Sequence, residues 1–126
     1  FKNMGSDIKT HKDLLVWQKS IDFVVDIYET TNSFPQSELF ALTNQIRRCA
    51  TSISGNIAEG SGRRGNREFI QFLHISLGSA TELETYLIIA ERLVYISKEK
   101  FIYLNNSLSE IIKMLIGLLK SIKGKD

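Results

Sequence analysis

REFIQFLHISLGSATELETYLIIAERLVYI, residues 67–96, is the longest amphipathic segment of the chain. Apolar and small side chains recur along it at alternating steps of four and three: Phe69, Leu73, Ser76, Ala80, Leu83, Leu87, Ala90 and Val94. This spacing places them on one face of an α-helix, and its persistence over about three heptads is typical of helices that pack side by side. The segment therefore predicts a long helix within an all-α fold.

Three further helices are predicted, over about residues 13–30, 36–59 and 98–123. Their expected core positions are Leu14, Leu15, Ile21, Val24, Val25 and Tyr28 in the first; Leu39, Leu42, Ile46, Cys49, Ile53 and Ile57 in the second; and Phe101, Leu104, Leu108, Ile111, Leu115, Leu118 and Ile122 in the last. Connections this short make neighbouring helices antiparallel. We expect a single up-down-up-down four-helix bundle over residues 13–123, preceded by an N-terminal arm, residues 1–12.

The composition fits one domain that does not enter a membrane. Of 126 residues, 43% are hydrophobic and 24% charged, and no run approaches the ~18 apolar residues of a membrane span. The first residues lack the basic and apolar regions of a secretory signal. A single cysteine, Cys49, excludes an internal disulfide and fits a reducing compartment. We expect a cytoplasmic protein.

The segment 67–96 carries more apolar side chains than one packed face needs. A second stripe contains Phe72, Ile75, Tyr86, Ile89 and Leu93, and a third contains Ile70, Leu77, Ile88 and Tyr95. Either this helix lies deeper in the bundle than the others, or the surplus contacts another copy of the chain. We expect self-association, with Ile70, Leu77, Ile88 and Tyr95 at the interface. Gly78 and Gly117 each cost a helix about 1 kcal/mol, which close approach of another helix would explain.

Arginines concentrate in the middle of the chain. Across residues 44–74, five arginines stand against two glutamates, a local net charge of +3, whereas the whole chain carries +2. These arginines are Arg47, Arg48, Arg63, Arg64 and Arg67. Arginine suits phosphate recognition, so the cluster predicts a nucleic-acid surface. The alternatives are a solvated charged turn, or arginines that pair with Glu59 and Glu68.

The glycine-rich segment NIAEGSGRRGNREF, residues 56–69, reads as a turn between helices. It lacks the lysine and the preceding strand of a phosphate-binding loop. We expect Gly60 to adopt a left-handed conformation at a helix C-terminus, and Gly62 and Gly65 to let the chain reverse. Asn66 is expected to cap the next helix, and Glu68 to favour its positive end.

No set of residues predicts catalysis or a cofactor. His11 and His74 are far apart, and no spacing of histidine, cysteine or acidic residues predicts a metal site. Cys49 lies on a predicted apolar stripe, where an inert thiol is the norm. Glu82 and Glu84 point to different faces of one helix and do not form an acid–base pair. We expect a protein that is not an enzyme and needs no cofactor.

Three segments carry motifs of a known family: WQKSIDFVVDIY, LTNQIRRCATSISGNIAEGSGR and EFIQFLHISLGSATELETYLIIAERLVYI. Within them NIAEG, EFxxFL and GSxxELE follow one another in order. Over about residues 12–96 the chain resembles the four-helix-bundle proteins encoded in intervening sequences of bacterial 23S rRNA genes. The positions that match the family motif are Arg47, Arg48, Asn56, Glu59, Gly60, Arg63, Glu68, Phe69, Gly78, Glu82 and Glu84.

The resemblance implies a small bacterial protein that forms a ring-like homo-oligomer, a pentamer. Related bundles, the accessory proteins of diversity-generating retroelements, are thought to bind a reverse transcriptase and nucleic acid through basic surfaces. The resemblance assigns no activity to this branch and no role to the motif positions. Cys49 departs from the pattern, standing where the family has alanine.

Two functions are compatible with these features. The first is a homo-oligomeric bundle that binds RNA or DNA, with RNA favoured, through the five arginines repeated around a ring. The second is a protein-interaction scaffold or accessory subunit, for example of a polymerase, that makes no contact with nucleic acid.

Overall fold

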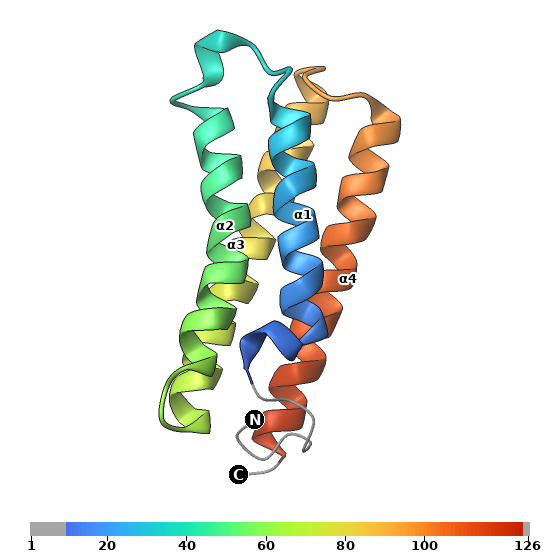
Figure 1. Cartoon of the computed structure of the whole chain (residues 1–126). Helices are drawn as coiled ribbons and strands as arrows, with labels where there is room; N and C mark the ends of the chain where they lie inside the picture. Colours follow the sequence, from blue (N-terminus) through green and yellow to red (C-terminus); the bar gives the residue numbers. More distant parts are fainter. Residues whose placement is uncertain (1–9, 125–126) are drawn as a thin grey trace.

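The computed structural model describes residues 10–124 of the chain. It contains four α-helices, α1 (Leu15–Thr31), α2 (Leu42–Ser61), α3 (Asn66–Arg92) and α4 (Lys98–Lys123), and no strand among the described residues. Two short 3-10 turns, η1 (His11–Asp13) and η2 (Gln36–Glu38), precede α1 and α2. The predicted all-α four-helix bundle is confirmed, and Figure 1 shows consecutive helices running in alternating directions. Residues 1–9 of the predicted arm lie outside the described part.

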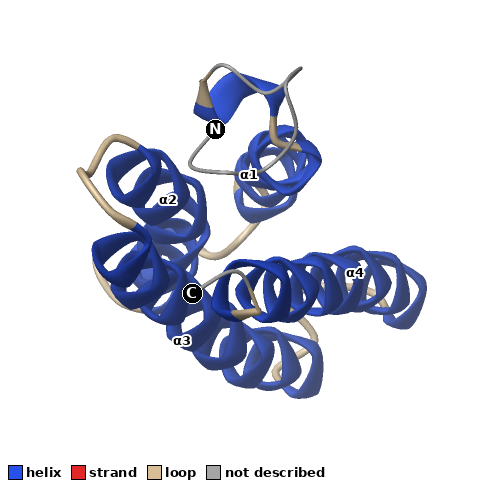
Figure 2. Ribbon diagram, turned by 90° about the horizontal axis from the view of Figure 1, so that it is seen from below, coloured by secondary structure: helices blue, strands red, loops and turns tan. Residues whose placement is uncertain are grey.

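Each helix packs against two neighbours. Figure 2 shows α1 beside α2 and α4, with α3 completing the bundle on the other side. The contact between α2 and α3 is the most extensive, and that between α1 and α4 is the least extensive of the four. The core runs the length of the bundle and is almost entirely aliphatic, with Phe23 and Phe69 as its largest fully buried side chains.

Small residues hold α2 and α3 close together. The Ser76 hydroxyl, fully buried, donates a hydrogen bond across the interface to the Ile53 carbonyl at 2.9 Å. The Ser52 and Ser79 hydroxyls are hydrogen-bonded at 2.8 Å. At Gly60 an added Cβ would lie 2.6 Å from the Phe72 Cβ. Glycine or serine at positions 52, 60, 76 and 79 allows the two helices to approach this closely.

The predicted core positions of α3 are all buried except the last one, Val94. The side chains from Phe69 to Ala90 on this stripe are all buried. The predicted helix end at 96 is wrong, because α3 ends at Arg92. Val94 is 83% exposed and has a φ of 62°, a left-handed conformation that stops the helix.

The predicted core face of the first helix is right at Leu14, which is buried, and at Val24, which is partly buried, but wrong at its other four positions. The buried positions are Val16, Ser20, Phe23, Ile27, Thr30 and Thr31, whereas Ile21, Val25 and Tyr28 are exposed. Both sets recur at steps of three and four, so periodicity alone does not choose between them. Ser20 belongs to the core because its hydroxyl donates to the Trp17 carbonyl at 2.7 Å, within its own helix.

The second helix begins later than predicted. Residues 36–41 form η2 and an irregular corner instead of a first helical turn, and Ala41 adopts φ −122° and ψ −107°. The Glu38 carboxylate then accepts the Leu42 amide at 3.3 Å. From Ile46 onward the predicted stripe of α2 is buried. The predicted stripe of α4 differs at its two ends, where Phe101 is only partly buried and Leu119 is buried more deeply than Leu118.

The glycine-rich turn differs from its prediction in two details. Gly60 is a buried helical residue without a left-handed φ, and it permits the contact with Phe72 instead of ending α2. Gly65, not Asn66, occupies the N-cap of α3. Gly78 and Gly117 are exposed, and an added Cβ at either would meet nothing within 4 Å among the described residues.

Two glycine substitutions separate packing from helix propensity. We expect Gly60→Ala to lower the free energy of unfolding by about 1–3 kcal/mol, because its Cβ would overlap Phe72 on the facing helix. Gly55→Ala, in the same helix with nothing within 4 Å of its Cβ, should raise it by about 0.5–1 kcal/mol. Chemical denaturation followed by circular dichroism measures both. Equal stability of the two variants would contradict the close contact.

Candidate functional site

The five candidate arginines do not form one surface. Arg47 and Arg48 lie near the start of α2, whereas Arg63, Arg64 and Arg67 lie around the turn between α2 and α3. At 1.5 Å per residue, the helix between Arg47 and Arg63 separates the two groups by about 24 Å. The sequence cluster is therefore divided between opposite ends of the bundle (Figure 1).

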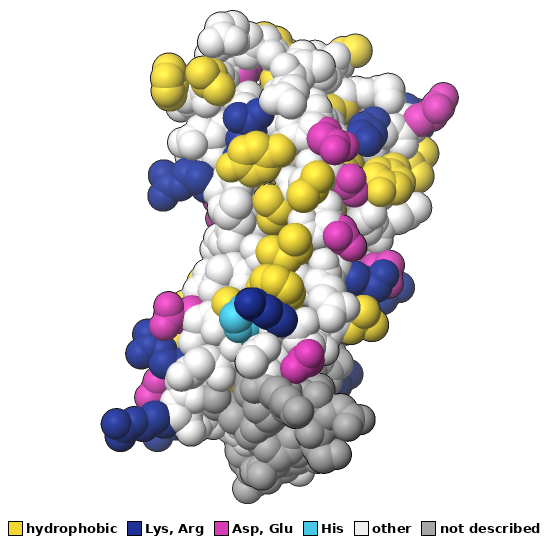
Figure 3. Space-filling view, in the orientation of Figure 1, with side chains coloured by type: hydrophobic (Ala, Val, Ile, Leu, Met, Phe, Trp, Pro, Cys, Tyr) yellow, Lys and Arg dark blue, Asp and Glu magenta, His cyan; other side chains and the backbone are white. Residues whose placement is uncertain are grey.

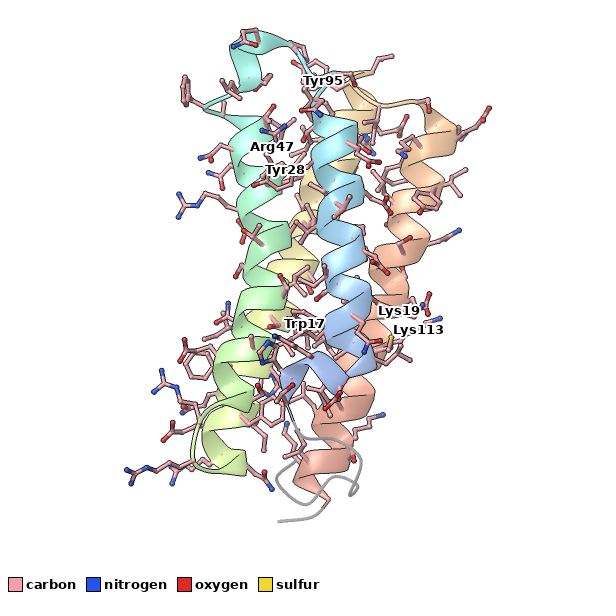
Figure 4. All side chains as sticks on the ribbon, in the orientation of Figure 1. Trp17, Lys19, Tyr28, Arg47, Tyr95 and Lys113 are labelled. Carbon is pink, nitrogen blue, oxygen red and sulfur yellow. The ribbon has the colours of Figure 1, made fainter. Side chains whose placement is uncertain are left out.

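Arg47 is half-buried between α1 and α2. Its Nε donates to the Thr31 hydroxyl at 2.9 Å and its Nη2 to the Asn32 side-chain oxygen at 3.3 Å. Its guanidinium carbon lies 4.6 Å from the centre of the Tyr28 ring, and Figure 4 shows Arg47 and Tyr28 together near one end of the bundle. Arg47 thus ties the end of α1 to the start of α2.

Arg48 borders an open groove of about 340 Å³ between α2 and α3. The other residues that line the groove are Gln45, Cys49, Ser52, Ser79 and Glu82. Glu82 accepts a hydrogen bond from the Tyr86 hydroxyl at 2.6 Å, which raises the pKa of Tyr86. Arg48 and Glu82 are not within ion-pair distance of each other, so opposite charges stand at two sides of the groove.

The thiol of Cys49 is not activated in this groove. Burial raises the pKa of Cys49 to about 11; the negative charge of Glu82 adds to this effect and the positive charge of Arg48 opposes it. The thiol is therefore protonated at neutral pH, and neither histidine lines the groove. The described residues also contain no group of three or more histidine, cysteine or acidic residues that could hold a metal ion.

At the α2–α3 turn, one of the three arginines is neutralised. Arg63 lies 3.0 Å from Glu59 and 3.9 Å from Glu68, and its guanidinium is 4.9 Å from the Phe72 ring centre. Arg64 and Arg67 are exposed and make no ion pair among the described residues. The expectation of pairing with Glu59 and Glu68 thus holds for Arg63 alone.

Two lysines that are distant in sequence reach the same end of the bundle. The last turn of α4 carries Lys120 and Lys123, both exposed, and α4 packs beside α3 (Figures 1 and 2). Lys123 Nζ is 3.3 Å from His74 Nε2 on the third turn of α3. We name Arg64, Arg67, Lys120 and Lys123 the basic end. Sequence analysis missed the lysines because only the antiparallel packing of α3 and α4 brings them to this end.

The remaining family-motif residues mostly build the α2–α3 contact. Asn56 donates to the Ser52 carbonyl at 2.8 Å and to its hydroxyl at 3.0 Å, which completes the serine pair with Ser79. Phe69 is fully buried beside Gly60. Gly78 is exposed, and Glu84 is half-buried on α3.

The predicted interface residues on α3 and just after its end have different surroundings. Ile70, Leu77 and Tyr95 are partly buried and pack against the core of their own chain. Tyr95 also donates to the Glu38 carboxylate at 2.8 Å. Ile88 is 42% exposed. Most of this stripe therefore already has a partner within the bundle.

A more exposed apolar surface lies on α1. Ile21, Val25 and Tyr28 are 36%, 52% and 41% exposed and lie at helical spacing; we name them the α1 apolar face. Figure 3 shows hydrophobic side chains following α1 along the side turned to the viewer. Sequence analysis placed these residues in the core, so it missed the surface. No helix in the described part is long and apolar enough to cross a membrane.

The fold is that of a small four-helix-bundle protein, and comparison with known proteins identifies its family. The model of the 23S rRNA-intervening sequence protein family matches residues 12–117, and the chain belongs to this family. Among solved structures it is similar to a protein with unknown function from the S23 ribosomal protein family of Bacteroides thetaiotaomicron VPI-5482. The two are 34% identical with a TM-score of 0.78, over 84% of this chain and 96% of that one. No match was found among curated proteins.

The pKa of Cys49 depends on two charges that border the α2–α3 groove, those of Glu82 and Arg48. We expect alkylation of the native thiol by iodoacetamide to rise about tenfold per pH unit until the pH approaches 11. Glu82→Gln should shift this profile to lower pH, because it removes a negative charge that disfavours the thiolate. Arg48→Gln should shift it to higher pH. Profiles that coincide for all three proteins would show that neither charge acts on the thiol.

Proposed function

We propose that the protein is a non-enzymatic, homo-oligomeric scaffold whose copies associate through the α1 apolar face. The observation that carries this proposal is the exposure of Ile21, Val25 and Tyr28 along one side of a helix. Burial of such a stripe is favourable by roughly 25 cal/mol for each Å² of apolar surface removed from water. A contiguous apolar stripe on a small bundle supports a protein contact.

Charge complementarity favours the outer side of α4 as the surface of a second copy that contacts the α1 apolar face. In α1, one lysine stands against three acidic residues, a net charge of −2; in α4, five lysines stand against two glutamates, a net charge of +3. Asp22 and Glu29 border the α1 apolar face, and both are exposed. On α4, Ile102 and Ile116 are 49% and 38% exposed among the lysines. Both surfaces are thus apolar, with borders of opposite charge.

Such a contact joins two different surfaces, so it is head-to-tail. Head-to-tail contacts repeat from copy to copy and close into a ring when the rotation allows. The ring of five copies that the family resemblance implies is part of this proposal. Exposed Gly117 on α4 supports it as well, because no contact within the described residues requires a glycine at this position.

Removing apolar surface from α1 tests the assembly. We expect Ile21→Gln with Val25→Gln to weaken association about 10–30-fold, since each half-exposed side chain contributes about 1 kcal/mol at an interface. Sedimentation equilibrium over a range of concentrations measures this. Val94→Asn, which removes an exposed apolar side chain outside the helices, is the matched control and should leave association unchanged. Wild-type protein that stays monomeric at micromolar concentration would refute the proposal.

Nucleic-acid binding is the second candidate function, and the basic end favours it. Four exposed cations gather there from three segments, and Arg64 and Arg67 have no ion-pair partner among the described residues. Repetition of this end around an oligomer would multiply its positive potential. The five-arginine surface of the sequence prediction is replaced in this proposal by the basic end, because Arg47 and Arg48 lie at the other end of α2.

The salt dependence of RNA binding tests the basic end. We expect Arg64→Ala with Arg67→Ala to weaken binding of single-stranded RNA and to reduce the slope of log affinity against log salt by about 1.4. Arg92→Ala, an exposed arginine at the far end of α3, should leave the slope unchanged. Fluorescence anisotropy at several salt concentrations measures it. Absence of binding at ~50 mM salt would exclude this candidate.

A further inference from the structure

The outer face of the α2–α3 pair is not covered by any other element of the described chain. Figure 2 shows the two helices side by side, with this face turned away from α1 and α4. Along α3 and at its C-cap the face carries Ile75, Ile89 and Leu93, which are 49%, 39% and 50% exposed and lie at helical spacing. An exposed apolar stripe of this length supports a protein contact.

Two charges of opposite sign lie in the middle of this face. Arg48 on α2 and Glu82 on α3 border the open groove of about 340 Å³ from its two sides, and both are exposed. Neither makes an ion pair among the described residues. Glu82 does accept a hydrogen bond from the Tyr86 hydroxyl, but that neutral donor leaves its charge uncompensated. The face therefore has one positive and one negative side.

Arg48 and Glu82 lie at nearly the same height along the bundle. The Ser52 and Ser79 hydroxyls, hydrogen-bonded at 2.8 Å, mark one level of the antiparallel pair. One turn of about four residues toward the start of α2 reaches Arg48. One turn toward the end of α3 reaches Leu83, the neighbour of Glu82. The two charges are thus separated across the face and not along it.

This placement makes the face complementary in charge to itself. A two-fold axis that runs parallel to the helices places α2 of one copy against α3 of a second copy at the same height, and the reverse. Arg48 of each copy then faces Glu82 of the other copy, so one interface contains this ion pair twice. A two-fold axis perpendicular to the helices at this height would instead bring like charges together, which is unfavourable.

The two sides of the face are also complementary in size. Gly55 is exposed on α2, and an added Cβ there would meet nothing within 4 Å among the described residues. Counted from the level of Ser52 and Ser79, Gly55 lies at the height of Ser76, next to Ile75. In the two-fold arrangement Ile75 of one copy therefore faces Gly55 of the other, where no side chain stands in its way. Glycine lowers the stability of a helix, and packing within the described chain gives no reason for this one.

We propose that the outer face of the α2–α3 pair binds the same face of a second copy about a two-fold axis parallel to the helices. Arg48 and Glu82 form reciprocal ion pairs at its centre, and Ile75 packs over Gly55 on each side. The contact leaves α1 and α4 free. It is therefore separate from the head-to-tail contact through the α1 apolar face, and it pairs copies that the head-to-tail contact does not join.

The test uses the full chain with the head-to-tail contact already weakened by Ile21→Gln and Val25→Gln. In this background, sedimentation equilibrium should show a monomer–dimer equilibrium that depends on the α2–α3 pair alone. A protein that stays monomeric up to about 100 μM in this background would overturn the proposal without bearing on the α1 apolar face. Wild-type protein that forms dimers and nothing larger would refute the head-to-tail contact and support this one.

Charge reversal tests whether the ion pairs join two copies. In the same background, Arg48→Glu alone and Glu82→Arg alone should each weaken the dimer at least about tenfold, because each variant places two like-charge contacts in the interface. An equimolar mixture of the two variants should recover the dimer, because both contacts between unlike copies again join opposite charges. A mixture that associates no better than either variant alone would overturn the proposal, since charges that act within one chain cannot be restored by another chain.

Gly55 provides a test that changes no charge. Gly55→Gln should weaken the dimer at least about tenfold, because its side chain takes the place of Ile75 of the second copy. Gly117→Gln is the matched control: Gly117 is also an exposed helical glycine with nothing within 4 Å of an added Cβ among the described residues, but it lies on α4. It should leave the dimer unchanged, and circular dichroism checks that both variants are folded. Equal dimerisation of the two variants would contradict the contact at Gly55.

Discussion

The close packing of α2 on α3 is the constraint on which the rest of the bundle depends. Gly60 against Phe72, the buried Ser76 hydroxyl on the Ile53 carbonyl, and the Ser52–Ser79 pair all require the two helices to approach within reach of short side chains. Hydrogen bonds across an otherwise apolar interface also fix the register of the two helices, because a shift would leave buried hydroxyls unsatisfied. Three of the family-motif positions, Asn56, Gly60 and Phe69, lie on this contact, so these residues are first explained by the fold.

The other helices are placed by this pair. Because the turn between α2 and α3 is short, it becomes one tip of the bundle, and α4 returns beside α3 to bring Lys120 and Lys123 to the same end. The first helix packs on α2 and less extensively on α4, and it turns Phe23 and Ile27 inward. Its second apolar set, Ile21, Val25 and Tyr28, is left facing outward.

Ionic interactions within the chain reduce the charge that remains for a partner. Glu59 and Glu68 form ion pairs with Arg63. Arg47 is half-buried at the junction of α1 and α2, where it is hydrogen-bonded to Thr31. What remains at the α2–α3 tip is a modest set of exposed cations. A single copy would hold a nucleic-acid backbone weakly, so the proposed nucleic-acid function depends on assembly.

The sequence alone determined the fold class, the four helices and the core faces of α3 and most of α2 and α4, because one stripe in each recurs at unbroken steps of three and four. It also determined the location of the turn, through its glycines. Only the tertiary structure decided which face of α1 is buried, because two stripes there have the same period. Ser20 can lie on the buried face since its hydroxyl donates a hydrogen bond within its own helix. The tertiary structure alone placed the five arginines at two opposite ends of the bundle and brought Arg47 into contact with the end of α1. Periodicity reports which residues share a face, but charge partners and cavities depend on distances between helices, which the order of residues along one helix does not contain.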